Sequence, residues 1–94
     1  MSAVKKKEYQ DGQYEGSLIG DKRDGKGKHV YTIGGSYDGD WQNDLCHGSG
    51  TKTWPDGSTY TGDFRFGRRN GFGTFISSQG WQFEGQFHKN MISG

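Results

Sequence analysis

Aromatic residues recur along the chain at a fixed interval, and polar residues alternate with them. An aromatic residue returns every 23 positions, a glycine follows two positions later, and a large apolar residue follows two positions after that. The aromatic set is Tyr14, Tyr37, Tyr60 and Phe83, and the large apolar set is Leu18, Trp41, Phe64 and Phe87. Alternate residues of a β-strand point to opposite faces of the sheet. Each block therefore predicts a strand with one aromatic face and one polar face.

A second strand is predicted in each unit after a short turn. In the central unit it runs from Gly48 to Trp54, again with alternating residues, and it begins with a Gly-x-Gly pair. The pairs are Gly25/Gly27, Gly48/Gly50 and Gly71/Gly73. The preceding turn carries a residue that tolerates positive φ at one fixed position, namely Asp21, Asp44, Gly67 and Asn90. Each unit is therefore predicted to be a β-hairpin.

Repetition at this period indicates units that bury their apolar side only against their neighbours. We expect an all-β fold, a single-layer, elongated, twisted antiparallel sheet of consecutive β-hairpins. The array covers residues 11–94, with units at 11–33, 34–56, 57–79 and a partial unit at 80–94. Residues 1–10, with three consecutive lysines, are a basic N-terminal arm or a capping strand. The partial unit ends at Gly94 before its second strand is complete, which suggests a fragment, a short isoform or an end completed by a partner.

The glycine pairs indicate how a single sheet makes a core. Glycine inside a strand costs about 0.5–1 kcal/mol relative to alanine, so its repeated use needs a compensating contact. If the rings of Tyr37 and Trp41 lie over neighbouring glycines, the missing side chains provide the space that the rings fill. We expect two aromatic ladders along the array. One side of each ring is expected to face outward and to form an apolar groove.

Composition narrows the classes of function. The chain has 94 residues, enough for one array and no second catalytic domain. Only 28% of the residues are hydrophobic, a value typical of disorder, but six Phe, five Tyr and three Trp fall mostly on the repeat positions and favour an ordered fold. A net charge of +1 with mixed signs argues against nucleic acid as a partner. One cysteine and no long apolar run favour a cytosolic protein.

The combined pattern resembles the MORN repeat (membrane occupation and recognition nexus). The best copy runs from Tyr37 to Gly57 and includes Cys46-His47-Gly48-Ser49-Gly50 and a closing Asp56-Gly57. The histidine position departs from the family pattern in the other units, where Asp24, Asn70 and Ser93 stand. The resemblance implies a non-enzymatic adaptor or scaffold at membranes, the cytoskeleton, cilia or flagella, and repeats that recognise peptide segments or dimerise.

No catalytic, metal or cofactor site is expected. Cys46 and His47 are adjacent and so face different ways, and no C-x-x-C or H-x-x-x-H spacing brings in His29 or His88. His47 is expected to pack or to form a hydrogen bond in the hairpin loop. The carboxylates of the polar face are interpreted as solvated cross-strand partners of Lys26 and Lys28, and they are Glu15, Asp38, Asp40, Asp63 and Glu84.

Two functions remain open. The first is binding of a partner helix or extended segment, or of a second copy, in the aromatic groove. Its residues are Tyr14, Leu18, Tyr37, Trp41, Trp54, Tyr60, Phe64, Phe83 and Phe87. The alternative is peripheral binding of anionic phospholipid by basic residues of the hairpin loops. Those residues are Lys22, Arg23, Arg65, Arg68 and Arg69.

Overall fold

One antiparallel sheet holds all the strands formed by the described residues. A computed structural model of the chain describes residues 4–89 and 91–92. Its strands are β1 (Val4–Tyr9), β2 (Gly12–Ile19), β3 (Lys22–Tyr31), β4 (Ser36–Gln42), β5 (Leu45–Thr53), β6 (Thr59–Arg65), β7 (Arg68–Ile76), β8 (Gln82–His88) and β9 (Met91–Ile92). The strands lie in the sheet in the order of the sequence. The prediction of a single-layer all-β sheet of consecutive hairpins is confirmed.

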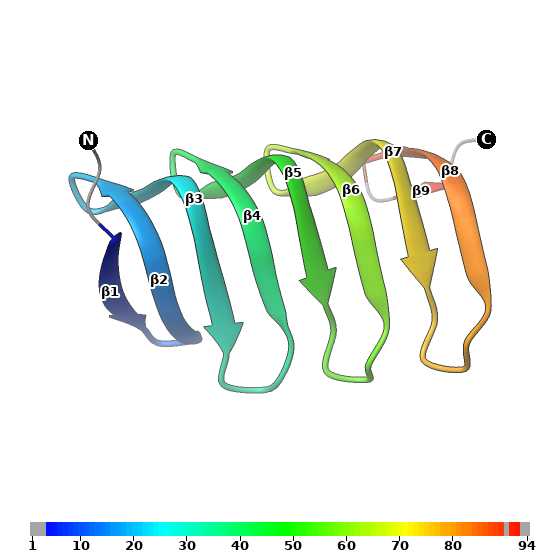
Figure 1. Cartoon of the computed structure of the whole chain (residues 1–94), viewed down its shortest axis with the longest axis horizontal. Helices are drawn as coiled ribbons and strands as arrows, with labels where there is room; N and C mark the ends of the chain where they lie inside the picture. Colours follow the sequence, from blue (N-terminus) through cyan, green and yellow to red (C-terminus); the bar gives the residue numbers. More distant parts are fainter. Residues whose placement is uncertain (1–3, 90, 93–94) are drawn as a thin grey trace.

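The sheet is elongated, with extents of 38 × 24 × 18 Å. Figure 1 shows a row of strands in which the tight turns after β2, β4 and β6 lie along one edge, and the longer links lie along the opposite edge together with the turn between β1 and β2. We call these the tip edge, with the turns at 20–21, 43–44 and 66–67, and the link edge, with the links at 32–35, 54–58 and 77–81. β1 and β8 lie near opposite ends of the row (Figure 1).

Residues 4–9 extend the sheet by one strand. β1 pairs with β2 from Val4 opposite Ser17 to Tyr9 opposite Gly12. The connection between them is two residues long, which is typical of a tight hairpin. Residues 1–10 were expected to be either a basic arm or a capping strand, and residues 4–9 form a strand. Residues 1–3 lie outside the described part.

Left-handed residues close the turns of the tip edge. Asn43 and Asp44 have φ of 49° and 71°, and Phe66 and Gly67 have φ of 51° and 82°. Positive φ at both central residues is the mark of a type I′ turn, whose twist matches that of the flanking strands. The prediction that Asp44 and Gly67 are left-handed turn residues is confirmed.

The first turn differs from this prediction. Its left-handed residue is Gly20, with φ of 62°, and Asp21 does not have positive φ. Glycine at the first central position is the pattern of a type II′ turn, which needs no left-handed residue at the second position. The prediction for Asp21 was therefore wrong, and Asn90 lies outside the described residues.

The aromatic side chains form one zigzag. Consecutive edge-to-face contacts join rings whose centroids are 4.8 to 5.5 Å apart and whose planes cross at 82° to 90°. The order along the zigzag is Tyr14, Trp41, Tyr37, Phe64, Tyr60, Phe87 and Phe83. The two ladders expected from the sequence are thus interleaved. Each contact contributes about 0.5–1.5 kcal/mol beyond the area that it buries.

The second glycine of each pair lies beneath a tyrosine ring. A Cβ added at Gly27, Gly50 or Gly73 would meet the ring of Tyr14, Tyr37 or Tyr60, respectively. The predicted role of glycine as the floor for a ring is confirmed at these positions.

The first glycine of each pair has a different role. Gly48 has φ of 100° and lies where the pairing of β4 with β5 shifts, between Gly39 and Trp41. The carboxylate of Asp40 accepts the Ser49 N–H there at 3.1 Å. The simple alternation predicted from Gly48 to Trp54 is therefore interrupted by a bulge, which glycine permits because the position is left-handed.

Candidate functional site

The aromatic face of the sheet carries an inner row of side chains in direct register. From β2 to β8 the residues opposite one another are Tyr14, His29, Tyr37, Lys52, Tyr60, Phe75 and Phe83. Residues directly opposite one another share a face, so the row defines one side of the sheet, called here the inner face. Tyrosines of the even strands alternate in the row with side chains of the odd strands.

The expected exposure of the groove residues is wrong for most of them. The described residues of the core are at most 5% exposed, and they are Tyr14, Tyr37, Trp41, Tyr60, Phe64 and Phe87. Each ring packs edge-to-face between neighbours of adjacent units. A single layer therefore covers its own rings through the zigzag. Of the predicted groove residues, Leu18, Trp54 and Phe83 remain half-buried.

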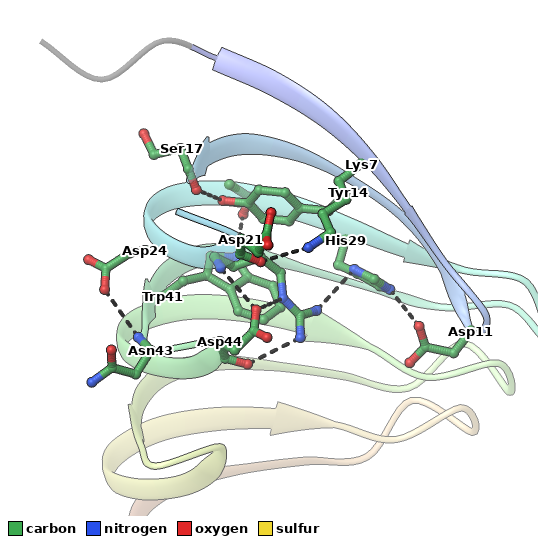
Figure 2. Close-up of polar contacts among 12 residues, drawn as sticks. Lys7, Asp11, Tyr14, Ser17, Asp21, Asp24, His29, Trp41, Asn43 and Asp44 are labelled. Atoms are coloured by element: carbon green, nitrogen blue, oxygen red, sulfur yellow. Dashed lines mark hydrogen bonds and ion pairs between the residues drawn. The ribbon is translucent and has the colours of Figure 1, made fainter. Parts of the chain in front are cut away.

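The tyrosine hydroxyls are also satisfied within the fold. Tyr14, Tyr37 and Tyr60 each donate to the backbone carbonyl three residues on, at 2.7, 2.8 and 2.9 Å. Figure 2 shows the bond from Tyr14 to Ser17. Burial raises the pKa of Tyr14 to about 12, so the phenol keeps the proton that it donates. These rings are structural and carry no open polar group.

The accessible part of the inner face lies toward the link edge. It is a band of rings and one lysine, which we call the aromatic–lysine band, formed by Tyr31, Lys52, Trp54, Phe75 and Trp81. Trp54 and Phe75 have ring centroids 5.7 Å apart, and Phe75 and Trp81 have theirs 5.5 Å apart. Trp81 is 55% exposed and the other members are half-buried.

Sequence reasoning identified only Trp54 in this band. Trp81 lies two positions before Phe83, and Tyr31 lies two positions after His29, so alternation in a strand places both on the inner face. Both lie outside the aromatic-x-Gly-x-apolar block from which the ladders were predicted. Trp81 does not repeat, since Ser58 and Gly35 occupy the corresponding positions of the two preceding units, and only its neighbours in the strand reveal its side.

A polar cluster closes the inner face at the first unit. His29 is 0% exposed, and its Nε2 lies 3.1 Å from the carboxylate of Asp11 while its Nδ1 lies 3.2 Å from the Arg23 guanidinium. Arg23 also forms an ion pair with Asp44 at 2.7 Å. Figure 2 shows His29, Asp11 and Asp44 with their polar contacts beside Trp41.

The hydrogen-bond partners of His29 determine which of its ring nitrogens carries the proton. A guanidinium can only donate, so Nδ1 of His29 accepts from Arg23 and Nε2–H donates to Asp11. Burial and the neighbouring Arg23 lower the pKa of His29, and they outweigh the opposing effect of Asp11. The imidazole is therefore neutral and holds one tautomer.

The five predicted lipid contacts do not share one surface. The guanidinium of Arg23 lies 4.5 Å from the Tyr9 ring centroid and 4.4 Å from that of Trp41, and its side chain is 15% exposed. Arg69 lies 5.3 Å from the Trp54 ring and 5.5 Å from the Phe87 ring. Both arginines thus turn onto the inner face, because a flat guanidinium stacks well on rings.

The other three, Lys22, Arg65 and Arg68, are exposed at the tip edge. Large apolar residues are exposed there too, at 66% for Ile19, 45% for Leu45 and 63% for Phe66. A cavity of about 380 Å³ opens beside Phe66 and is lined by Arg65, Phe66, Arg68, Asn70, His88 and Lys89. The tip edge therefore combines positive charge with exposed apolar side chains.

The residues at the histidine position connect each unit to the next turn. Asp24 and His47 accept the backbone N–H groups of Asn43 and Phe66 at 3.1 and 3.3 Å. Figure 2 shows the first of these bonds. The expectation that His47 packs or forms a hydrogen bond in the loop is confirmed, since its ring also lies 5.1 Å from that of Phe66.

One of the expected cross-strand ion pairs is found on the polar face of the described residues. Lys26 forms an ion pair with Asp40. Partial burial disfavours the charge of Asp40, but the hydrogen bonds from Lys26 and Ser49 outweigh it and lower the pKa of the carboxyl. These interactions are solvated, and exposed pairs of this kind contribute about 0–1 kcal/mol.

Cys46 is a packing residue of the inner face. It lies opposite Trp41 and belongs to the residues packed against the core. Burial raises the pKa of its thiol to about 11, so the reactive thiolate is scarce at neutral pH. Within residues 4–89 and 91–92, no group of three His, Cys, Asp or Glu side chains is arranged to hold a metal ion.

Comparisons with known proteins bear on the whole array. Among the described residues there is no helix with the length and apolar character needed to cross a membrane. A search of curated proteins finds no significant match. The family model of the MORN repeat matches residues 14–36, 37–59, 60–82 and 83–94, starting each unit at its first aromatic residue. This frame begins three positions after the boundaries that we expected from the sequence and has the same period. Because the matches run continuously over most of its length, the chain belongs to the MORN repeat family.

Proposed function

We propose that the chain is a non-enzymatic binding module that takes up a helix or extended segment of a partner protein along the aromatic–lysine band. MORN repeats are generally associated with protein or membrane interactions. The proposal rests on the division of the inner face into a buried part and an accessible part. The zigzag is sealed by its own contacts, whereas the rings of Trp54, Phe75 and Trp81 form a continuous accessible stack beside it.

The composition of the band fits a protein partner. Tryptophan, tyrosine and arginine dominate the energetics of protein interfaces, because they bury a large area and keep a polar end. Arg69 stacks on Trp54 and Phe75 at 5.3 and 5.9 Å, so the band presents rings that are already ordered. Ordered side chains lose little entropy when a partner binds.

The test is selection of a displayed random peptide library against the folded chain, followed by titration of the selected peptides. We expect Trp81→Ala to weaken binding by about tenfold or more, since it removes an exposed interface ring. Ile76→Ala on the polar face is the matched control and should leave affinity unchanged, because Ile76 is 40% exposed and faces away from the band. Peptides that bind both variants equally would disprove the proposal.

Self-association through the aromatic–lysine band is tested separately. Light scattering over a range of concentrations measures it, and a dimer that Trp81→Ala disrupts would identify a second copy as the occupant of the band. A monomer leaves the band open to another protein.

A second candidate function is peripheral binding to anionic membranes by the tip edge. The observation that favours it is Phe66, which is 63% exposed and has φ of 51°, a conformation that a bulky residue rarely adopts. Arg65 and Arg68 flank it. Exposed apolar side chains with adjacent cations are suited to the interface between headgroups and acyl chains.

Vesicle sedimentation tests this second candidate. Vesicles containing phosphatidylserine should bind the chain at low salt and release it at high salt, since the cations contribute about 1 kcal/mol each near the surface. Arg68→Gln should weaken binding, and Lys28→Gln, on the polar face, is the control. Binding that is equal for both variants, or that salt leaves unchanged, would contradict it.

A further inference from the structure

Two consecutive units place an N–H donor at the same point of the inner face. His29 and Lys52 are 23 positions apart, opposite Tyr14 and Tyr37 in β2 and β4. Each lies against the ring two positions further on. The ring centroids of His29 and Tyr31 are 4.7 Å apart, and the Lys52 ammonium lies 5.5 Å from the centroid of Trp54. The two donor sites are therefore equivalent by repeat position and by their aromatic setting.

The chain itself completes the donor site of the first unit. The carboxylate of Asp11 accepts from Nε2 of His29 at 3.1 Å, and the ring of Tyr9 lies 5.3 Å from the imidazole. His29 is 0% exposed as a result. A short stretch with an aromatic residue and, two positions later, a carboxylate thus covers the inner face at this unit.

The equivalent site of the second unit keeps the ring of that cover but lacks its carboxylate. Tyr31 is the counterpart of Tyr9 in the sheet, since His29 lies opposite Tyr37 as Lys7 lies opposite Tyr14, and its ring is 6.0 Å from the Lys52 ammonium. The link at 32–35 has no carboxylate to match Asp11. Lys52 is half-buried, and no carboxylate of the described residues lies within 4 Å of its ammonium. The ammonium lies 6.0 Å from the ring centroid of Tyr31 and 5.5 Å from that of Trp54.

We propose that Lys52, with Tyr31 and Trp54, binds a carboxylate of the partner segment. The occupant is a segment with Asp or Glu, whose carboxylate takes at Lys52 the place that the Asp11 carboxylate has at His29. This inference rests on the proposed function and specifies the chemistry of its partner. A carboxylate next to an ammonium and two rings forms a charge-assisted hydrogen bond from which water is partly excluded, which strengthens the attraction.

Charge reversal gives the sharpest test. A displayed random peptide library is selected in parallel against the wild-type chain, Lys52→Glu and the control Lys28→Glu. Lys28 is exposed on the polar face, opposite Asp38, and changes net charge equally. We expect Asp and Glu to be enriched in peptides selected by the wild type and by the control, and Lys and Arg to replace them in peptides selected by Lys52→Glu.

A second variant covers the risk that a buried glutamate disturbs the fold. Lys52→Gln keeps most of the stem and removes the charge. We expect a wild-type-selected peptide to bind this variant roughly fivefold more weakly. An Asn-for-Asp version of the peptide should bind the wild type and Lys52→Gln equally. Circular dichroism checks that both variants fold.

The outcomes separate the two proposals. Peptides that need Trp81 but show no acidic enrichment, and that bind Lys52→Gln as well as the wild type, would overturn the carboxylate site and leave the aromatic–lysine band standing. Peptides that bind without need of Trp81, or a library that yields no binder, would overturn both.

Discussion

At the scale of single residues, the repeat is built on pairs of complementary positions. A tyrosine occupies the space left by a glycine of the next strand, as Tyr37 does over Gly50. Its hydroxyl then satisfies the carbonyl of Asp40, where the chain bulges. The tyrosine, the glycine beneath its ring and the carbonyl that its hydroxyl satisfies depend on one another. We therefore expect little tolerance of substitution at the tyrosine and glycine positions.

Alanine at Gly50 tests this dependence. Its Cβ would meet the Tyr37 ring, and overpacking of a core typically costs about 1–3 kcal/mol. We expect Gly50→Ala to lower the free energy of unfolding, measured in urea, by about this amount. Ser49→Ala, one position away and exposed, is the control. Equal stability of the two variants would show that the ring does not depend on the glycine.

The buried histidine predicts how stability depends on pH. The lowered pKa of His29 means that, below about pH 6.5, the unfolded chain binds a proton that the folded chain does not. The contribution of His29 is therefore complete above pH 6.5 and is lost as the pH falls toward its folded pKa. Glutamine offers the same acceptor and donor to Arg23 and Asp11 without titrating. We expect the free energy of unfolding to fall less in His29→Gln than in the wild type between pH 8 and 5.

Asp44 loses its contribution in a different pH window. Burial opposes the charge of Asp44, but hydrogen bonds from Arg23 outweigh it and lower the pKa of the carboxyl. Its contribution is present above the usual pKa of an aspartate, about 3.9, and is lost only at lower pH. A pH dependence between 8 and 5 that is the same in the wild type and in His29→Gln would contradict the assignment to His29.

At the scale of elements, each hairpin is tied to the previous one by its turn. The Asp44 N–H bonds the carbonyl of Arg23 at 2.9 Å, and the Gly67 N–H bonds that of Cys46 at 2.8 Å. Together with the acceptors at Asp24 and His47, these bonds hold the type I′ turns against the edge of the array. The turns are thus part of the contact between units as well as the ends of strands.

The turn at Phe66 carries an unfavourable residue. Asparagine tolerates positive φ better than phenylalanine, and Asn-Gly is the preferred pair of a type I′ turn. We expect Phe66→Asn to raise the free energy of unfolding by about 0.5–1 kcal/mol. The reverse change at the equivalent position, Asn43→Phe, should lower it. A destabilised Phe66→Asn would show that the contact of Phe66 with His47 matters more than its backbone conformation.

At the scale of the whole molecule, stability passes from unit to unit through shared rings. Trp41 belongs to the second unit, yet it contacts Tyr14 and donates to the carbonyl of Gly27 at 3.0 Å. Arrays of this kind derive stability from nearest-neighbour contacts, so damage at one junction has its largest effect nearby.

Phenylalanine at Trp41 tests this transmission. It keeps an aromatic ring, as in Phe64 and Phe87, but removes the hydrogen bond to Gly27. We expect Trp41→Phe to cost about 1–2 kcal/mol. Hydrogen exchange should show the greatest loss of protection in β1–β4 and the least in β7 and β8. Uniform loss over all strands would mean that the array unfolds as one cooperative body.

Most of the architecture could be predicted from the periodic residues, because the same pattern occurs in several units. The hairpins, the single layer and the glycine floor under Tyr14 were all predicted on this basis. Burial of the rings was not predicted, since the zigzag depends on side-chain orientation across units. The aromatic–lysine band was missed because it combines residues such as Lys52 and Trp81, which do not repeat. The repeat period reveals the residues that the units share, and it gives no information on the residues in which they differ.

Because the strands are regularly spaced, the length of the sheet is proportional to the number of units. Neighbouring strands lie about 4.8 Å apart, so each two-stranded unit adds about 9.6 Å. Seven residues of α-helix rise about 10.5 Å, nearly the same interval. The long dimension of 38 Å corresponds to about 25 residues of helix or about 11 of extended strand. Under the proposed function, the number of units sets the length of the partner segment that the sheet can contact, and each added unit lengthens it by about one heptad.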